Sequence, residues 1–316
     1  MGMARLVLWR VLAVVPIMLV VSFVTFVLLS TNPVDPAEQL LGPTASEEQL
    51  EAKRHELGLD EPVLVRYADW LGGAVTGDLG QSIYTTTPVA TSIGDRAGVT
   101  LSLTVGGLIV ALVIGFPAGV SSAMRAGRPA DRLTMVAATA GQAVPAFWLG
   151  TLLLLVFAVR WSIFNAVFYV PPSDSVTGWL KSIVLPCIAL GASGAAWIAR
   201  QTRSELVTVL QQDYIRTALA KGASRHQVLF GHALRNAGGP LLTVVALLVS
   251  AVLSASFVIE AVFALPGLGS LALESINRND PAPVLGFVVC VVFVVVIVNV
   301  LLDLIQGWLN PKVRAL

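Results

Sequence analysis

The stretch AGVTLSLTVGGLIVALVIGFPAGVSSAM, from Ala97 to Met124, runs for 28 residues without a charged side chain. A helix needs about 20 mostly apolar residues to cross the hydrocarbon core of a bilayer. No water reaches the backbone at that depth, and a single segment can satisfy all of its own N–H and C=O groups only as a helix. This stretch therefore predicts one membrane-spanning helix.

Charge-free windows of at least 18 residues recur along the chain. Counting the first, six such windows lie between Arg10 and Asp35, Arg96 and Arg125, Arg132 and Arg160, Lys181 and Arg200, Arg235 and Glu260, and Asp280 and Asp303. Over all 316 residues, 56% are hydrophobic and only 12% are charged, whereas a soluble domain has about 25% charged residues. We therefore expect an all-α integral membrane protein with six transmembrane helices.

The basic residues predict how these helices are oriented. If both termini are cytoplasmic, 13 of the 20 Lys and Arg residues lie on the cytoplasmic side, and four of the other seven lie in one long external segment. Cytoplasmic loops carry an excess of Lys and Arg, and long external loops count little in this rule. We therefore expect both termini in the cytoplasm.

The external segment, residues 31–98, is too long for a plain connection and carries signals of ordered helices. Ser46-Glu47-Glu48-Gln49 is a capping-box pattern, which predicts a helix that stops at Gly58. Pro62 suits the first turn of a second helix, which we expect to end at Gly72-Gly73. Two interpretations stay open: a small cap over the outer ends of the spans, or a docking platform for an external partner.

The other long segment, residues 200–238, predicts a helix, a turn and a second helix on the cytoplasmic side. Asp213 to Ala220 has a helical pattern, Gly222 supplies the turn, and Ser224 with Gln227 forms another capping box. The basic charge of this segment has a simple explanation, which is orientation or contact with anionic lipid. The alternative is contact with a protein partner.

A few residues inside the windows are candidates for packing or for the transport path. Gln142 lies in the third window, where an amide forms a helix–helix hydrogen bond more often than a substrate contact. We expect Gly115, Pro117 and Pro145 to bend or thin their helices, with plain packing as the alternative. Cys187 and Cys290 lie in apolar runs, so we expect buried hydrophobic residues and no metal site.

Several motifs resemble, in order, those of the permease subunits of ATP-binding-cassette (ABC) importers. YIRTALAKG, from Tyr214 to Gly222, is similar to the cytoplasmic loop motif of these permeases, and HALRNA, from His232 to Ala237, is similar to the run that follows it. Further matches to the B-type subunit of dipeptide and oligopeptide permeases, a family with nickel-type members, lie at Leu57 to Leu71, Gly77 to Ser82, Val144 to Leu153 and Ile259 to Leu271.

The resemblance implies a type I ABC importer permease in a bacterial plasma (inner) membrane. A second homologous permease subunit would complete the path for small peptides, which opens by alternating access, and an extracytoplasmic substrate-binding protein would deliver the peptide. Two ATPase subunits, or one fused ATPase, would bind ATP and Mg, so we expect no cofactor in this chain and no nucleic acid partner. Import of a nickel chelate, glutathione or another small solute by the same architecture stays open.

Two groups of residues are candidate sites. The resemblance implies an ATPase-coupling loop made of Asp213, Tyr214, Arg216, Thr217, Ala218, Ala220, Lys221, Gly222, Ala223 and Ser224. Beside the fifth window, a periplasmic gate or docking site would comprise Glu260, Pro266, Gly267 and Gly269, with a plain interfacial charge at Glu260 as the alternative.

The domain organisation follows from the spans. Residues 1–30 form the N-terminal cytoplasmic end and first transmembrane helix, residues 31–98 the extracytoplasmic cap, and residues 99–316 a five-helix permease core that includes the coupling loop. The sequence has no Gly-x-x-x-x-Gly-Lys-[Ser/Thr] loop, and we find no paired carboxylates or nucleophile elbow. We therefore expect a transport subunit and not an enzyme. The span interiors lack the ionisable groups that proton-coupled carriers usually use, which argues against a secondary transporter.

Overall fold

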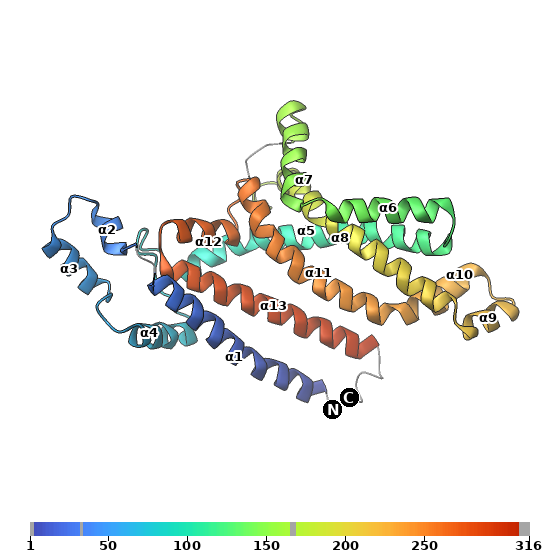
Figure 1. The fold of residues 1–316 in the computed structure, drawn as a ribbon, viewed down its shortest axis with the longest axis horizontal. Helices are drawn as coiled ribbons and strands as arrows, with labels where there is room; N and C mark the ends of the chain where they lie inside the picture. Colours follow the sequence, from blue (N-terminus) through green and yellow to red (C-terminus); the bar gives the residue numbers. More distant parts are fainter. Residues whose placement is uncertain (1–2, 32–33, 165–168, 310–316) are drawn as a thin grey trace. The chain divides into compact units, whose positions relative to one another are not determined.

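The computed structural model is built from helices. Apart from one isolated bridge between Gln81 and Pro88, the regular structure is helical throughout the described residues, which are 3–31, 34–164 and 169–309 (Figure 1). The predicted all-α class is therefore confirmed for this part of the chain.

The chain divides into two compact units, each of which packs on its own. The core unit is centred on Val99–Pro266, and the flanking unit is built from Val7–Gly98 and Gly267–Ile297. The predicted functional domains, with boundaries after residues 30 and 98, stay a prediction.

Helix α8 (Val176–Leu210) is the centre of the core unit. It packs against α6 (Pro129–Ala143), α7 (Ala146–Leu153) and α11 (Leu234–Val262), and most of its apolar stretch is buried (Figure 1). The side chains gathered there are small or branched apolar groups, among them Cys187, Leu190, Ile198, Leu248, Val252 and Ile259. This apolar centre matches the charge-free fourth and fifth windows.

Helix α5 (Val89–Met124) approaches α8 closely at its glycines. A Cβ atom added at Gly119 would lie 2.6 Å from the carbonyl oxygen of Ala199, and one added at Gly115 would collide with the backbone of Ala195. Small residues spaced four apart allow two membrane helices to pack backbone against backbone. The prediction that Gly115 thins its helix is therefore confirmed.

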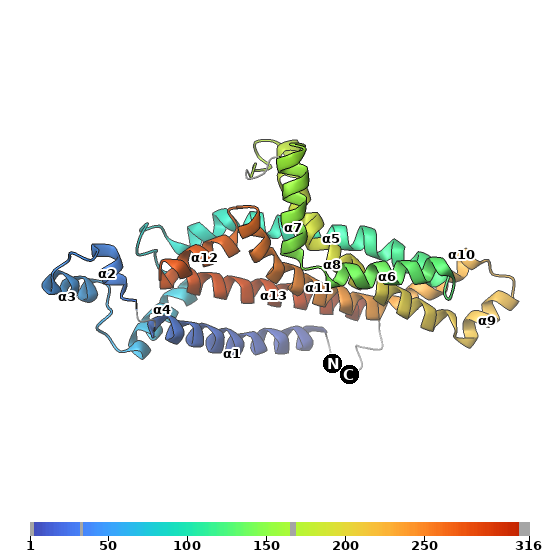
Figure 2. The ribbon, with the colours of Figure 1, turned by 45° about the horizontal axis from the view of Figure 1, so that its top comes forward.

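The third apolar window forms two helices instead of one straight span. Helix α6 ends at Ala143, and α7 with its π-helical continuation η1 (Leu154–Arg160) follows at a bend of 92° (Figure 2). Pro145 explains the break, because proline donates no backbone hydrogen bond and pushes the preceding residue out of the helical region. Val144 is accordingly extended, with φ −81° and ψ 120°. The bend predicted at Pro145 is confirmed.

Within the described part of the chain, four helices are long and apolar enough to cross a membrane. They are α5, α8, the helical run Arg225–Val262, and Pro281–Leu301 of helix α13 (Pro281–Leu309). The bent pair would make a fifth, and α1 (Met3–Ser30) contributes a shorter apolar stretch, Val14–Ser30. Four or five of the six predicted spans are thus confirmed, while the first span and the cytoplasmic termini stay predictions.

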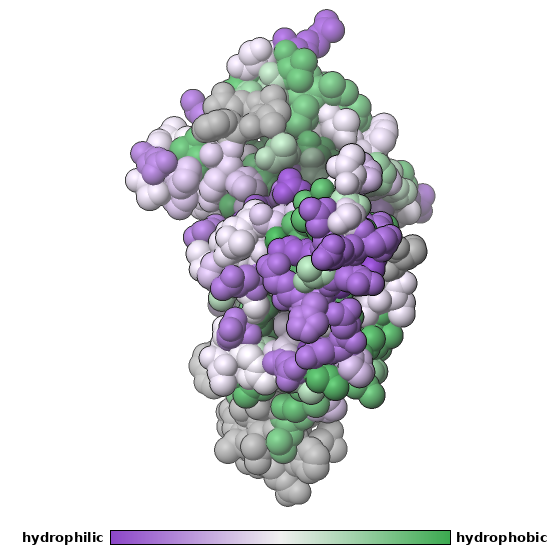
Figure 3. All heavy atoms as spheres, turned by 90° about the vertical axis from the view of Figure 1, so that its left-hand side faces the viewer, coloured by the Kyte–Doolittle hydropathy of each residue, from purple (hydrophilic) through white to green (hydrophobic). Residues whose placement is uncertain are grey.

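The flanking unit contains the short helices of the predicted external segment. They are α2 (Pro36–Leu41), α3 (Glu47–Glu56) and α4 (Val63–Thr76), and the same unit contains α12 (Leu268–Asn277). Hydrophilic side chains of α2 and α3 gather on one face (Figure 3). This segment is therefore ordered and polar, as both open interpretations require.

The helix boundaries of this segment follow the sequence signals in part. The capping box of α3 is confirmed, because Ser46 and Gln49 each accept a hydrogen bond from the other's backbone N–H. The predicted stop at Gly72-Gly73 is wrong. Helix α4 continues to Thr76 and ends at Gly77, which has φ +94°, because glycine readily adopts the left-handed conformation that closes a helix.

Candidate functional site

The predicted coupling loop forms a helix, a glycine turn and a second helix. Helix α9 (Asp213–Ala220) follows α8, and the chain then turns at Gly222, which has φ +87°. Ser224 begins α10 (Arg225–Gln227) with a complete capping box: its Oγ accepts from the Gln227 N–H at 3.3 Å, and the Gln227 Oε1 accepts from its N–H at 2.8 Å. The local structure predicted for this segment is confirmed.

The second helix of this loop is not a separate unit. Helix α10 continues through a π-helical segment, η2 (Val228–Ala233), directly into α11, so that Arg225–Val262 is one helical run of 38 residues. We expected a helix, a turn and a second helix between the fourth and fifth apolar windows. The structure instead extends the fifth apolar helix into the loop, and π-helical segments often lie at functional sites.

The loop has one buried side and one exposed side. Ile215, Val228 and Leu229 are buried, whereas Tyr214 and Phe230 are exposed. Helix α9 packs against η2. Isolated exposed apolar residues are common, but aromatic side chains beside basic residues have the composition of protein interfaces. The geometry brings the ten predicted loop residues together on α9 and the following turn, and their role stays a prediction.

The candidate gate residues are divided between the two units. In the core unit, Glu260 is fully buried on α11 and accepts a hydrogen bond from the Thr100 hydroxyl of α5 at 2.6 Å. Pro266 ends the same unit, while Gly267 and Gly269 lie in the flanking unit where α12 begins. Glu260 therefore links α5 to α11, and its carboxylate lies in the interior and not on the surface.

An ion pair with a buried carboxylate joins the first turn of α6 to α8. The carboxylate of Asp131 is 2% exposed and accepts two hydrogen bonds from Arg203, Nε to Oδ1 at 2.6 Å and Nη2 to Oδ2 at 2.7 Å. The Gly127 N–H donates to Oδ2 at 2.8 Å, and the Ser122 hydroxyl donates to Oδ1. Every oxygen of this carboxylate is thus bonded, as a buried charge requires.

Our sequence reasoning missed this pair, although it left a signal. We counted Arg203 only as an orienting charge. Asp131 is the only acidic residue among the basic residues of the turn, which include Arg125, Arg128 and Arg132. One turn earlier on α8, Arg200 donates a hydrogen bond to Gln142 of α6, so the predicted helix–helix role of Gln142 is confirmed.

Comparison with known proteins identifies the family. A family model described as the binding-protein-dependent transport system inner membrane component matches residues 115–315, and a model for the N-terminal part of such components matches residues 3–104. The chain belongs to this family. It is a multi-pass inner-membrane permease of an ABC importer, and membership implies a substrate-binding protein and an ATPase as partners.

Relatives agree with this assignment, and a solved structure matches in fold alone. The permease is 40% identical over 312 residues, 99% of each chain, to a Brucella abortus (strain 2308) protein named for a peptide transport system permease. It is 36% identical over 314 residues, 99% of each chain, to the glutathione transport system permease protein GsiC of Escherichia coli (strain K12). An inward-facing structure of the MetNI methionine ABC transporter matches in fold, with a TM-score of 0.58 and 20% identity over 69% of the permease and 96% of that chain.

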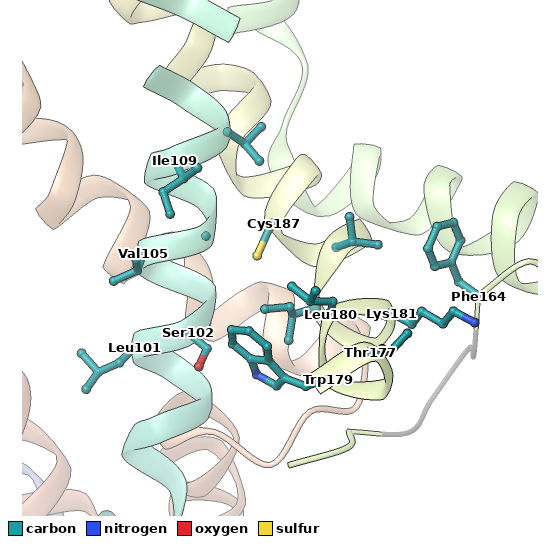
Figure 4. Close-up of a pocket in the computed structure, with 14 residues that line it drawn as sticks. Leu101, Ser102, Val105, Ile109, Phe164, Thr177, Trp179, Leu180, Lys181 and Cys187 are labelled. Atoms are coloured by element: carbon teal, nitrogen blue, oxygen red, sulfur yellow. The ribbon is translucent and has the colours of Figure 1, made fainter. Parts of the chain in front are cut away.

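The permease also has an apolar groove between α5 and α8. Its volume is about 740 Å³, and Figure 4 shows Ser102 of α5 on the side of Trp179 and Cys187 of α8, while Leu101 and Val105 lie on the other side of α5. A site for a polar ligand needs several convergent polar groups, and this lining is almost wholly apolar. Among the described residues, no group of three or more His, Cys, Asp or Glu side chains is placed to hold a metal ion.

Proposed function

We propose that this permease pairs with a second, homologous permease to form the translocation path for small peptides. Peptide is the substrate named for relatives at 40% and 34% identity over nearly the whole chain. The assembly would have the type I importer architecture, with six spans and both termini of this chain in the cytoplasm. ATP and Mg would bind to the partner ATPase subunits and not to this chain.

Glutathione is the second substrate class. It is supported by the 36% identical relative named as a glutathione permease. Glutathione is itself a short peptide-like molecule, so a path that admits small peptides could also admit it. Import of a nickel chelate or another small solute would use the same architecture. The ligand captured by the partner binding protein distinguishes these classes, and direct binding measurements on that protein would settle the choice.

The coupling loop carries the functional proposal. Helix α9 and the turn at Gly222 would seat in the ATPase, which closes on ATP and opens after hydrolysis. The backbone at Gly222 adopts φ +87°, yet a Cβ atom there would meet nothing within 4 Å in this chain. The space beside Gly222 is therefore free to receive a partner. Movement of α9 would rock the two permeases between inward-open and outward-open states around a central site.

The opposite end of α11 would carry the gate. We place Glu260 and Pro266 there, with Gly267 and Gly269 at the start of α12. The buried bond between Glu260 and Thr100 supports this role, because a helix displacement at this level must break or carry that contact. The polar face of α2 and α3 would receive the substrate-binding protein, in addition to covering the outer ends of the spans.

The test is a complex reconstituted in liposomes, in which peptide uptake and ligand-stimulated ATP hydrolysis are measured together. We expect Gly222→Asp to lower uptake per ATP hydrolysed by about 5- to 150-fold, the usual range of a coupling free energy. The complex should still assemble and the binding protein should still hold its ligand, because the change lies far along the chain from the external segment.

Gly42→Asp is the matched control. Gly42 also has a positive φ, +82°, and also has nothing within 4 Å of an added Cβ atom, so it carries the same backbone strain in the predicted external segment. Its uptake per ATP should stay at the wild-type value. Equal coupling in Gly222→Asp and wild type, with the complex intact, would overturn the assignment of the coupling loop.

A further inference from the structure

The ion pair between Asp131 and Arg203 has no part in the function argued so far. Its carboxylate is nearly completely buried and is bonded to a cation. Arg203 approaches with two parallel N–H groups, at 2.6 and 2.7 Å. Two parallel hydrogen bonds fix the orientation of the guanidinium relative to the carboxylate as well as the distance between them. Since Asp131 follows the turn between α5 and α6, the pair fastens that turn to α8.

Two of these helices, α5 and α8, also pack closely at their glycines. At Gly119 of α5, an added Cβ atom would lie 2.6 Å from both the carbonyl of Ala199 and the Cβ of Thr202. Gly191 of α8 is as tight against α5, with its own added Cβ 2.7 Å from the Gly107 carbonyl. Helices in such contact cannot slide without breaking it, because packed interiors do not deform continuously.

The pair lies directly next to the contacts that hold the coupling loop. Leu206, one turn after Arg203 on α8, belongs to a buried apolar cluster with Ala123 of α5 and with Leu229 and Ala233 of η2. Helix α9 rests on η2. A continuous series of contacts therefore runs from α9 through η2 and Leu206 to the ion pair.

We propose that Asp131 and Arg203 are positioning residues that make α5, α6 and α8 move as one rigid body when the ATPase displaces α9. The inference rests on the proposed coupling function. Without the pair, the turn between α5 and α6 would not move together with α8. Part of each displacement of α9 would then bend the core unit instead of moving it as a whole. The pair would thus set how much transport each ATP yields.

Two spin labels test rigidity directly. One is placed at Ala126 in the turn and one at Thr208 on α8, both of which are exposed, in a chain whose Cys187 and Cys290 are replaced. Interspin distances are measured in the complete complex before and after nucleotide trapping. We expect one narrow distance in wild type, unchanged by trapping, and a broadened or shifted distribution in Asp131→Asn and Arg203→Lys.

Transport is measured on the same samples. Uptake per ATP should fall about tenfold in Asp131→Asn, within the usual range of a coupling free energy, while the complex stays assembled. Arg203→Lys keeps the positive charge but loses the two parallel N–H groups of the guanidinium. Uptake per ATP should therefore fall less in this variant than in Asp131→Asn. The control Arg128→Gln removes an exposed cation from the same turn and should change neither distance nor coupling.

The outcomes separate this proposal from the one it rests on. A wild-type distance and wild-type uptake per ATP in Asp131→Asn would overturn the positioning role, even if Gly222→Asp is uncoupled. If Gly222→Asp transports normally, the coupling loop is wrong, but the distance measurement still reports whether the pair holds the three helices together. Where Asp131→Asn does not assemble, Arg203→Lys supplies both readouts, and wild-type values there overturn the proposal.

Discussion

At the scale of single residues, the glycines of α5 decide how closely two membrane helices can approach. Gly119 and Gly98 lie on the same helix, but an added Cβ atom collides with α8 at Gly119 and meets nothing within 4 Å at Gly98. A membrane helix gains no hydrophobic driving force from meeting another, so its association depends on such close contact. The two positions should therefore respond in opposite directions to the same substitution.

We predict that Gly119→Ala destabilises the permease by about 1–3 kcal/mol, the usual cost of overpacking. Gly98→Ala should be neutral or stabilising by up to about 1 kcal/mol, because alanine loses less backbone entropy in a helix. Thermal unfolding of the purified permease in detergent measures both. A lower midpoint for Gly98→Ala than for Gly119→Ala would contradict the helix contact.

At the scale of elements, the loop before α5 is tied to the start of α13 within the flanking unit. The Ser82 hydroxyl donates to Asp280 Oδ2 at 2.6 Å, and the Ile83 N–H lies 3.4 Å from Oδ1. Burial raises the pKa of Asp280 above its usual range, although these two hydrogen bonds act in the opposite direction. The folded state therefore holds this proton more tightly than the unfolded chain does.

The sign of the pH dependence follows. Because the pKa of Asp280 is higher in the folded state, its contribution to stability is present at low pH and is lost as pH rises through that raised pKa. We predict that Asp280→Asn, which keeps an oxygen to accept from Ser82, stabilises the permease relative to wild type more at pH 7 than at pH 4. Unfolding in detergent at the two pH values measures this. An identical difference at both pH values would contradict it.

At the scale of the whole molecule, the proposed topology places residues 31–98 outside the membrane and residues 200–238 in the cytoplasm. We predict that a membrane-impermeant thiol reagent applied from the periplasmic side modifies a cysteine at Glu51 and spares one at Arg225, in a permease lacking Cys187 and Cys290. Both positions are exposed, so accessibility within the chain does not bias the result. Permeabilised membranes give the control, in which both positions react. The reverse pattern in intact cells would invert the proposed topology.

Sequence reasoning succeeded where one local signal dominates. The capping boxes at Ser46 and Ser224 specify helix starts without help from distant residues, and both were predicted. It failed where the outcome depends on contacts far apart in sequence. Asp131 and Arg203 are 72 residues apart, and no pattern in either segment predicts that the two side chains meet. The helix end predicted at Gly72-Gly73 was wrong for another reason. Glycine is only weakly unfavourable inside a helix, and α4 continues through both residues.

The unbroken helical run Arg225–Val262 has a mechanical consequence. At 1.5 Å per residue its 38 residues form a rod about 57 Å long. If such a rod pivots about its midpoint by about 10°, each end sweeps about 5 Å, one helical turn. The N-terminal part of this run contacts α9, and Glu260 lies near its C-terminal end. One continuous helical run therefore connects the contact with α9 to the buried carboxylate of Glu260 near its other end.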